Sequence, residues 1–202
     1  MPRSCLPLET NYSHGMAINK IPNLPIIGSN VIVRCLQEDD LSEMYRMESD
    51  PEVKLYLNGP VRIPREEWIR GARSQLSWCQ TLAVSAKDTG QFAGRAALDS
   101  YVDSDYLDKE VTREIRVVIA KDYWGRHFGR EVCRILITMA FDELGAEQVI
   151  GIVHPENLNS LKLLGIFGFE KKGVVEDQSK QNGHLKFVLS RPHYQNRSLP
   201  EV

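Results

Sequence analysis

The sequence predicts an α/β fold in which helices flank a mixed sheet. Short β-branched and apolar segments alternate with helical patterns along the 202 residues of the chain. One predicted helix, Gly129 to Leu144, is apolar on a broad face and should pack against the sheet. The stretch Ile115 to Val132 has the pattern of a buried strand, a tight glycine-containing turn and the start of that helix. These patterns indicate helices packed around one central sheet.

The first third of the chain predicts an arm, a strand and a helix. Residues 1–28 contain repeated Pro and Gly without a sustained period, which is typical of an irregular N-terminal arm. The folded part should begin near Asn30, with a β-branched strand at Val31–Val33. Asp40–Glu43 resembles a capping box and should open a helix that Pro51 closes.

The middle of the chain predicts a second helix and three strands. Pro64 is a good first-turn residue, so a helix should begin there and end before Thr81. Lys87 to Gln91 has hairpin-turn chemistry. It should join the first two of three strands, which are predicted at Leu82–Ala86, Phe92–Tyr101 and Glu114–Ala120.

The last third predicts the apolar helix described above, followed by a strand, a helix and a hairpin. Gly145 stands where a left-handed cap should end the apolar helix. Asn182-Gly183 supplies a type I′ turn for the hairpin. The expected elements are strand Val149–Val153, helix Asn157–Ile166, and strands Phe169–Glu176 and His184–Leu189.

Composition excludes several classes of protein. A formal charge of −2 provides no basic stripe for nucleic acid or an anionic membrane. No apolar run approaches the ~20 residues of a membrane span, and the N-terminus lacks a signal-peptide pattern. The four cysteines are scattered without metal-ligand spacing, so we expect reduced thiols, no metal site and a cytoplasmic location.

Six short motifs occur in an order and spacing that resemble the GNAT superfamily of acyl-CoA-dependent N-acyltransferases, and within it the ribosomal-protein N-terminal acetyltransferases. The resemblance covers Val31 to Leu189 and implies a mixed, mostly antiparallel twisted sheet flanked by helices. It places the domain at residues 29–192, with a C-terminal tail at 193–202. The motifs are Val33-Arg-Cys-Leu36, Asp50-Pro-Glu-Val53, Asp88-Thr-Gly90, Tyr123-Trp-Gly125, Asn157-Leu-Asn-Ser160 and Phe167-Gly-Phe169.

The segment after the predicted strand matches the phosphate loop of that family. A helix N-terminus offers unpaired N–H groups and a positive dipole end to an anion. The last glycine of the pattern is kept as Gly129, but His127 replaces the middle one. A negative φ would suit His127, whereas a positive φ would strain it. The residues predicted to hold the pyrophosphate of acetyl-CoA are Arg126, His127, Phe128, Gly129 and Arg130; the alternative is a plain helix start.

The resemblance also implies contacts to the rest of acetyl-CoA. The strand residues Val117, Val118 and Ile119 should pair with the pantetheine arm, and the strand could offer an N–H to the developing oxyanion. Asn157 should contact the same arm. Asn157 is also a favoured helix N-cap, and both roles can hold together.

Two residues are candidates for the chemistry. Glu114 opens the strand before the loop and could accept the proton of the attacking ammonium; the alternative is a salt bridge with Arg113 or Arg116. Ser160 has a plain structural explanation in helix capping, and in addition it could hydrogen-bond the departing thiolate. Many GNAT enzymes place an acidic tyrosine four residues further on, where this chain has Leu164.

Two aromatic residues bear on the acceptor. Tyr56 lies where the family builds its acceptor pocket, with core packing as the alternative. His154, at the end of a predicted strand, is interpreted as a packing or hydrogen-bonding histidine and stays outside the predicted site. The acidic segment from Asp99 to Glu110 could steer a cationic acceptor or be a solvated loop.

The sequence therefore predicts an acetyl-CoA-dependent N-acetyltransferase. A primary amine, either a protein N-terminus or a small molecule, would attack the thioester directly, since no cysteine stands in a nucleophile motif. One alternative is a GNAT-fold acyl-CoA-binding module without catalysis, suggested by His127 and Leu164. A second is a non-enzymatic α/β protein. An exposed strand edge or the N-terminal arm could support a homodimer.

Overall fold

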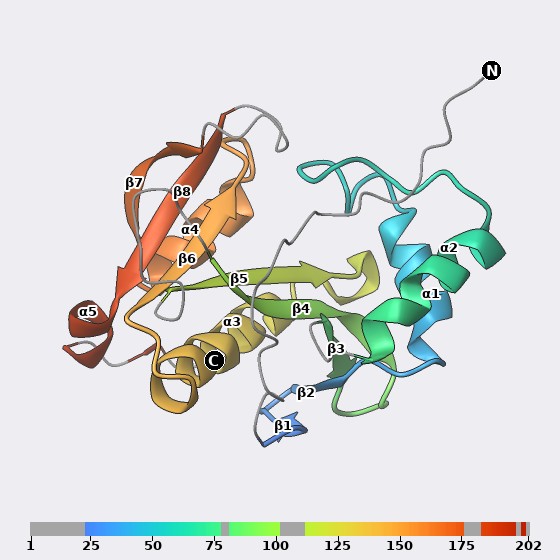
Figure 1. Cartoon of the computed structure of the whole chain (residues 1–202), viewed down its shortest axis with the longest axis horizontal. Helices are drawn as coiled ribbons and strands as arrows, with labels where there is room; N and C mark the ends of the chain where they lie inside the picture. The colour runs from blue at the N-terminus through green and yellow to red at the C-terminus, as the bar shows by residue number, and fades with distance from the viewer. Residues whose placement is uncertain (1–22, 78–80, 102–111, 176–182, 197–198, 201–202) are drawn as a thin grey trace.

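The computed structural model describes residues 23–77, 81–101, 112–175, 183–196 and 199–200, and within them it shows an eight-stranded sheet with helices on both faces (Figure 1). The strand order is β1-β2-β3-β4-β5-β6-β8-β7, and only β5 and β6 pair in parallel. The predicted mixed, mostly antiparallel sheet is confirmed. The strands are β1 (Ile26–Ile27), β2 (Val31–Cys35), β3 (Thr81–Ala86), β4 (Phe92–Ser100), β5 (Thr112–Ile119), β6 (Gln148–Val153), β7 (Glu170–Val175) and β8 (His184–Ser190).

The helices follow the predicted order, with one addition at the C-terminal end. The apolar face of α3 is buried as expected, and Gly145 has a φ of +65° after the helix ends. The helices are α1 (Asp40–Glu48), α2 (Arg65–Ala72), α3 (Phe128–Thr138), α4 (Leu158–Ile166) and α5 (Arg191–Gln195), with short 3-10 helices at Arg73–Ser77 and Lys121–Tyr123 and a π-helical turn at Met139–Glu143.

The two faces of the sheet carry different helices. Arg95 of β4 points toward α1, because its Nε lies 2.5 Å from Glu48 Oε1. Val118 is the β5 partner of Arg95, and directly opposed residues share a face, so Val118 lies on the α1 face. Ile119 must then point the other way. Gly129 of α3 lies against the Ile119 side chain, which places α3 on the second face.

The sheet splits between β5 and β6. The two strands are paired only from Thr112 to Glu114 on β5 and from Gln148 to Ile150 on β6. Beyond these residues β5 stays paired with β4 as far as Ile119, whereas β6 follows β8. In Figure 1 the two strands diverge and leave a wedge between them. We call the interval beyond Glu114 and Ile150 the β5–β6 split.

Several elements differ in detail from the predicted ones. Ile26–Ile27 lies inside the predicted arm but forms β1, which is too short to show a periodic pattern. Helix α5 crosses the predicted domain end at residue 192. The apolar helix widens into a π turn, since the Leu144 N–H bonds the Met139 carbonyl five residues back. Asn182 of the predicted turn is outside the described residues, and Gly183 has a φ of +103°.

The predicted capping box is also wrong. Asp39 is the N-cap of α1 and makes no side-chain cap. The Asp40 carboxylate instead pairs with Arg34, with Nη1 2.7 Å away, and accepts the Gln37 N–H. A buried carboxylate is best satisfied by a guanidinium fork, and this competing interaction takes Asp40 away from the helix end.

None of the described helices is long and apolar enough to cross a membrane. In the same part of the chain, no group of three or more His, Cys, Asp or Glu could hold a metal ion.

Candidate active site

The turn between β5 and α3 forms the centre of the candidate site. Gly125 has a φ of +75°, a left-handed conformation that glycine adopts without steric cost. The indole Nε1 of Trp124 donates to the Ile119 carbonyl at 2.8 Å, so the turn is fixed to the end of β5. Gly129, at the start of α3, lies between the Ile119 side chain at the end of β5 and Leu163 of α4, the helix that follows β6, so the N-terminus of α3 is beside the β5–β6 split.

His127 occupies the N-cap of α3 with a φ of +62° and a ψ of +6°. The φ of His127 is therefore positive, in the left-handed region, where a Cβ meets steric strain although His adopts it more often than most residues. The side chain is exposed and makes no side-chain cap. The strained backbone is thus retained without any benefit to helix capping.

The N-terminus of α3 has the donors that an anion requires. The N–H groups of Phe128, Gly129 and Arg130 belong to the first helical turn, where no carbonyl of the same helix can accept them. The buried Nε of Arg130 has no hydrogen-bond partner among the described residues. These orphaned donors fit a pyrophosphate.

Arg126 is already engaged in several contacts. Its guanidinium lies 4.9 Å from the centre of the Phe128 ring and 5.4 Å from that of Tyr123. Its Nη2 lies 3.2 Å from Asp88 Oδ2 in the β3–β4 turn. The Arg126 side chain is held beside the loop while remaining half-exposed.

Along β5, the backbone N–H and C=O groups of successive residues point alternately toward β4 and away from it. The Ala120 N–H bonds the Ala93 carbonyl, so in this antiparallel ladder the even-numbered residues of β5 bond to β4. The odd-numbered residues Val117 and Ile119 direct their backbone groups into the β5–β6 split. Val118 offers only its side chain to a ligand, because its backbone faces Arg95.

The N-terminus of α4 follows β6 and carries two of the predicted residues. Asn157 is the N-cap, and its Oδ1 accepts the Ser160 N–H at 3.1 Å, which confirms the predicted capping. Leu164 is buried against β6, since a Cβ on Gly151 would lie 3.1 Å from Leu164 Cδ2. The position that carries a tyrosine in many GNAT enzymes is therefore an apolar contact here.

Glu114 lies on the α1 face of the sheet at the root of the split. Its neighbours across the ladders are Asp99 on β4 and Ile150 on β6. Asp99 is ion-paired with Arg116, the next residue on the same face of β5. Residues 102–110, most of the predicted acidic segment, lie outside the described residues.

A buried ion triad fixes the connection between α1 and α2. Glu48 Oε2 lies 2.5 Å from Lys54 Nζ, and its Oε1 lies 2.5 Å from Arg95 Nε. Burial alone would raise the pKa of Glu48, but the charges of Arg95 and Lys54 outweigh it and lower that pKa. The triad joins α1, the connection and the α1 face of β4.

Tyr56 lies two residues after Lys54 and contacts the end of β6. The ring centres of Tyr56 and His154 are 5.3 Å apart, and those of His154 and His184 are 5.4 Å apart in an edge arrangement. His154 also accepts the Glu156 N–H at Nδ1, so it packs and hydrogen-bonds as its interpretation from sequence expects. It lies just beyond the carboxyl end of β6 beside the split, a position from which a side chain can meet a ligand.

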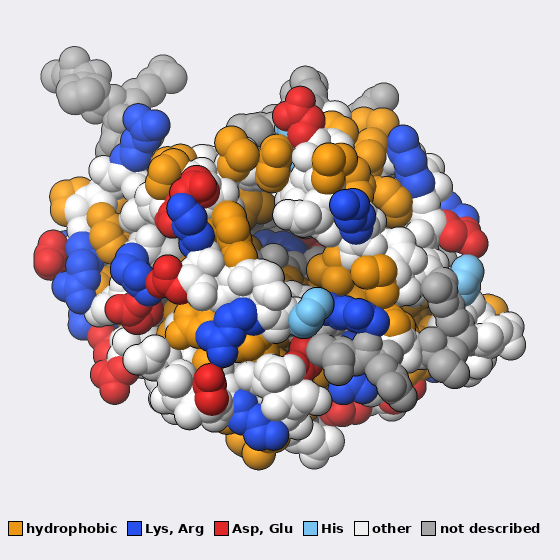
Figure 2. Space-filling view, turned by 180° about the vertical axis from the view of Figure 1, so that it is seen from behind, with side chains coloured by type: hydrophobic (Ala, Val, Ile, Leu, Met, Phe, Trp, Pro, Cys, Tyr) orange, Lys and Arg blue, Asp and Glu red, His pale blue; other side chains and the backbone are white. Residues whose placement is uncertain are grey.

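The predicted residues therefore form two groups along the split. The turn, the open edge of β5 and the start of α4 form one group, beside the N-terminus of α3. Glu114 and Tyr56 lie on the α1 face. From behind, the surface is hollowed near the level at which β5 and β6 diverge, with apolar and charged side chains around the hollow (Figure 2).

Comparison with known proteins agrees with this geometry. A family model described as an acetyltransferase (GNAT) domain matches residues 30–170, and the chain belongs to this family. An uncharacterized N-acetyltransferase p20 of Bacillus licheniformis is 27% identical over 163 residues, covering 76% of this chain and 86% of that protein. The protein is accordingly an N-acetyltransferase whose co-substrate is acetyl-CoA.

Solved structures share the fold at low sequence identity. A GNAT acetyltransferase from Bacillus anthracis is 16% identical with a TM-score of 0.70, covering 83% of this chain and 98% of that one. A spermidine N-acetyltransferase from Vibrio cholerae, in complex with CoA and spermine, is 17% identical with a TM-score of 0.67 and covers 84% and 100%. These likenesses establish the fold.

Proposed function

We propose that this protein transfers the acetyl group of acetyl-CoA to a primary amine by direct attack, without a covalent enzyme intermediate. The observation that carries the proposal is the β5–β6 split beside the N-terminus of α3. One edge of the split offers backbone groups to an extended ligand, and the helix end offers donors to an anion. When bound, acetyl-CoA supplies an activated acetyl thioester.

The proposed cofactor contacts follow from this arrangement. The N–H groups from Arg126 to Arg130 bind the pyrophosphate, with the orphaned Arg130 Nε directed to the same charge. The backbone groups of Val117 and the N–H of Ile119, whose carbonyl already accepts Trp124 Nε1, hydrogen-bond the pantetheine arm and the thioester oxygen. Asn157 keeps its amide NH₂ for pantetheine while its oxygen caps α4.

We assign the general base to Glu114. The acceptor arrives as an ammonium and must lose a proton before it can attack the thioester. Glu114 lies on the α1 face at the root of the split, where its carboxylate can accept that proton directly or through water. The Ser160 O–H donates a hydrogen bond to the departing thiolate, a role that Leu164 cannot fill.

The reaction is tested by release of free thiol from acetyl-CoA against a panel of amines, with mass spectrometry of the product. Glu114→Gln should lower kcat by on the order of 10²-fold and flatten the acidic limb of the pH–rate profile. Glu67→Gln, an exposed acid on α2, is the matched control and should leave both unchanged. An unchanged rate and pH profile in Glu114→Gln would remove it from the mechanism.

A second candidate function is acyl-CoA binding without catalysis. It is favoured by Leu164, which leaves the usual tyrosine acid absent, and by the strained His127. Saturable acetyl-CoA binding in calorimetry, combined with no thiol release for any amine, would establish this function instead.

A further inference from the structure

Three rings from separate segments meet where β6 ends and β8 begins. Val153 of β6 is paired with Leu185 of β8, so the next residues along, His154 and His184, are directly opposite each other. Opposed residues share a face, which explains their edge contact. Tyr56 adds the third ring from the α1–α2 connection, coloured cyan in Figure 1. We call these residues the Tyr56–His154–His184 cluster.

The cluster lies on the same face as the proposed base. Ile150 is the β6 neighbour of Glu114 and shares its face. Side chains alternate along a strand, so Ile152 and then His154 continue that face toward the wide end of the split. An amine that reaches Glu114 from this end must pass the cluster, whose three rings are half-buried.

The ion triad holds the backbone that carries Tyr56 in place. Lys54, two residues earlier, is buried in the ion triad with Glu48 and Arg95. The Lys54 N–H also bonds the Asp50 carbonyl. A ring attached to so constrained a backbone is prepared before the acceptor binds, which lowers the entropic cost of recognition.

The hydrogen bond of His154 determines which of its nitrogens carries the proton. Its Nδ1 accepts the Glu156 N–H at 3.2 Å, so Nδ1 is unprotonated. In a neutral imidazole the other nitrogen, Nε2, then carries the hydrogen and acts as a donor. A donor recognises an oxygen with lone pairs and cannot accept a hydrogen bond from an ammonium.

We propose that His154 is a specificity-determining residue whose Nε2–H binds an oxygen of the acceptor close to the reacting amine. The substrate class is therefore a primary amine with a neighbouring carbonyl or hydroxyl oxygen, as in a peptide N-terminus or an amino sugar. Bare polyamines lack that oxygen. This inference rests on the proposed acetyl transfer and names the acceptor class of the same site.

The face that carries Glu114 and the Tyr56–His154–His184 cluster also carries a basic side chain. Lys186 is opposite Ile152 in the ladder and lies between the positions of His184 and Val188 on that face. Its Nζ is 4.9 Å from the centre of the Tyr101 ring. Glu114 and Lys186 thus place side chains of opposite charge on this face of the sheet.

The test compares three acceptors, a peptide amide, an amino sugar and spermidine, in wild type and two variants of His154. His154→Phe keeps a ring beside Tyr56 and loses both nitrogens. His154→Asn keeps an oxygen for the Glu156 N–H and loses Nε2. For each acceptor, the kcat/KM of wild type is divided by that of the variant. The basicity of the amine affects both values equally and so does not affect this ratio. His193→Phe, on α5, is the matched control.

Both His154 variants should lower kcat/KM for an oxygen-bearing amine by on the order of tenfold, mainly through KM, and leave spermidine within about twofold. A comparison of the wild-type kcat/KM for the peptide and for the amino sugar shows which of these two oxygen-bearing acceptors the site prefers. An equal effect on all three acceptors, or none, would overturn the proposal.

Binding separates this proposal from the proposed function. Calorimetry of each acceptor with the enzyme and CoA needs no turnover, and wild type should bind the oxygen-bearing amines more tightly than His154→Phe does. If no amine releases thiol, the proposed function fails, while this binding preference still decides the role of His154. Equal affinity of wild type and His154→Phe for the oxygen-bearing amines would refute the proposed role of His154.

Discussion

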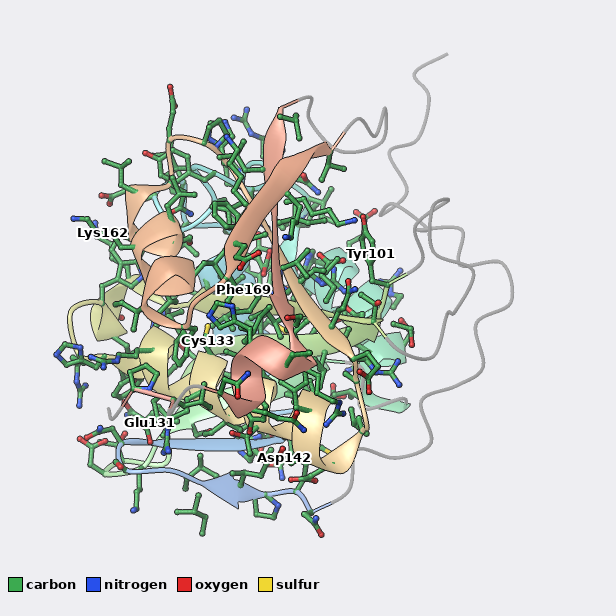
Figure 3. All side chains as sticks on the ribbon, turned by 90° about the vertical axis from the view of Figure 1, so that its left-hand side faces the viewer. Tyr101, Glu131, Cys133, Asp142, Lys162 and Phe169 are labelled. Carbon is green, nitrogen blue, oxygen red and sulfur yellow. The ribbon has the colours of Figure 1, made fainter. Side chains whose placement is uncertain are left out.

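The buried carboxylate of Glu131 on α3 holds the Asn30 backbone beside β2. Its oxygens lie 3.0 and 3.1 Å from the Asn30 N–H nitrogen, and Oε2 lies 3.1 Å from Asn30 Nδ2. Glu131 is fully buried, between α3 and the β1–β2 hairpin (Figure 3). A Cβ on Gly28 would lie 2.0 Å from Glu131 Oε1, so the hairpin turn closely surrounds the carboxylate. The proposed phosphate-binding helix is thereby joined to the N-terminal edge of the sheet.

Glu131→Gln should lower the free energy of unfolding by about 1–3 kcal/mol. An amide has one acceptor oxygen, and its NH₂ group would face the donors of Asn30 within a closed space. Urea denaturation followed by circular dichroism measures the change. Glu67→Gln, an exposed acid on α2, should change stability by less than about 0.5 kcal/mol. Equal stability of Glu131→Gln and wild type would show that the three hydrogen bonds contribute nothing net.

The left-handed backbone of His127 predicts a difference between two substitutions. His127→Ala removes the imidazole and keeps a Cβ at a φ of +62°, whereas His127→Gly removes both. The glycine variant should be the more stable of the two by about 1 kcal/mol, because glycine adopts this conformation without a steric cost. Thermal unfolding compares them, and an alanine variant of equal stability would contradict the strain.

The same pair of variants tests the proposed phosphate contact. If the imidazole binds pyrophosphate, both variants should bind acetyl-CoA several-fold more weakly in calorimetry. Unchanged affinity in His127→Ala would restrict the residue to a role in the turn. Gly129 supplies only a backbone N–H, so neither variant alters that contact.

The sequence was sufficient for features that depend on local chemistry. The strand, glycine turn and apolar helix around α3, and the Asn157 cap, follow from propensity and short-range hydrogen bonding. Features that depend on distant partners were missed. Asp40 is bound by Arg34 rather than by its own helix, and His154 contacts two rings only because β8 and the α1–α2 connection bring His184 and Tyr56 to it. No local pattern encodes such contacts.

The ion triad predicts sensitivity to acid. The pKa of Glu48 is lowered in the folded state from an ordinary value of 4.5, so its carboxylate stabilises the fold above that pH. This contribution is lost as pH falls below 4.5 through the folded pKa, since the protonated acid no longer balances Lys54 and Arg95. Stability measured by urea denaturation should therefore decline over this acidic range.

Glu48→Gln should remove that part of the pH dependence and lower the free energy of unfolding at neutral pH by about 3 kcal/mol, because two buried cations lose their partner. Glu43→Gln, on the exposed side of the same helix, breaks a pair with Arg46 and should cost under about 0.5 kcal/mol. A Glu48→Gln protein with wild-type stability and acid response would contradict a stabilising triad.

The buried thiol of Cys133 on α3 should be unreactive in the native protein. Burial raises its pKa to about 12, and only the thiolate is a nucleophile. Iodoacetamide at pH 8 followed by peptide mass spectrometry should label Cys133 in urea but not in buffer. Cys133→Ala should keep the wild-type rate of thiol release from acetyl-CoA, since direct attack requires no cysteine. Rapid native labelling, or loss of turnover in a folded Cys133→Ala protein, would instead indicate a covalent thiol route.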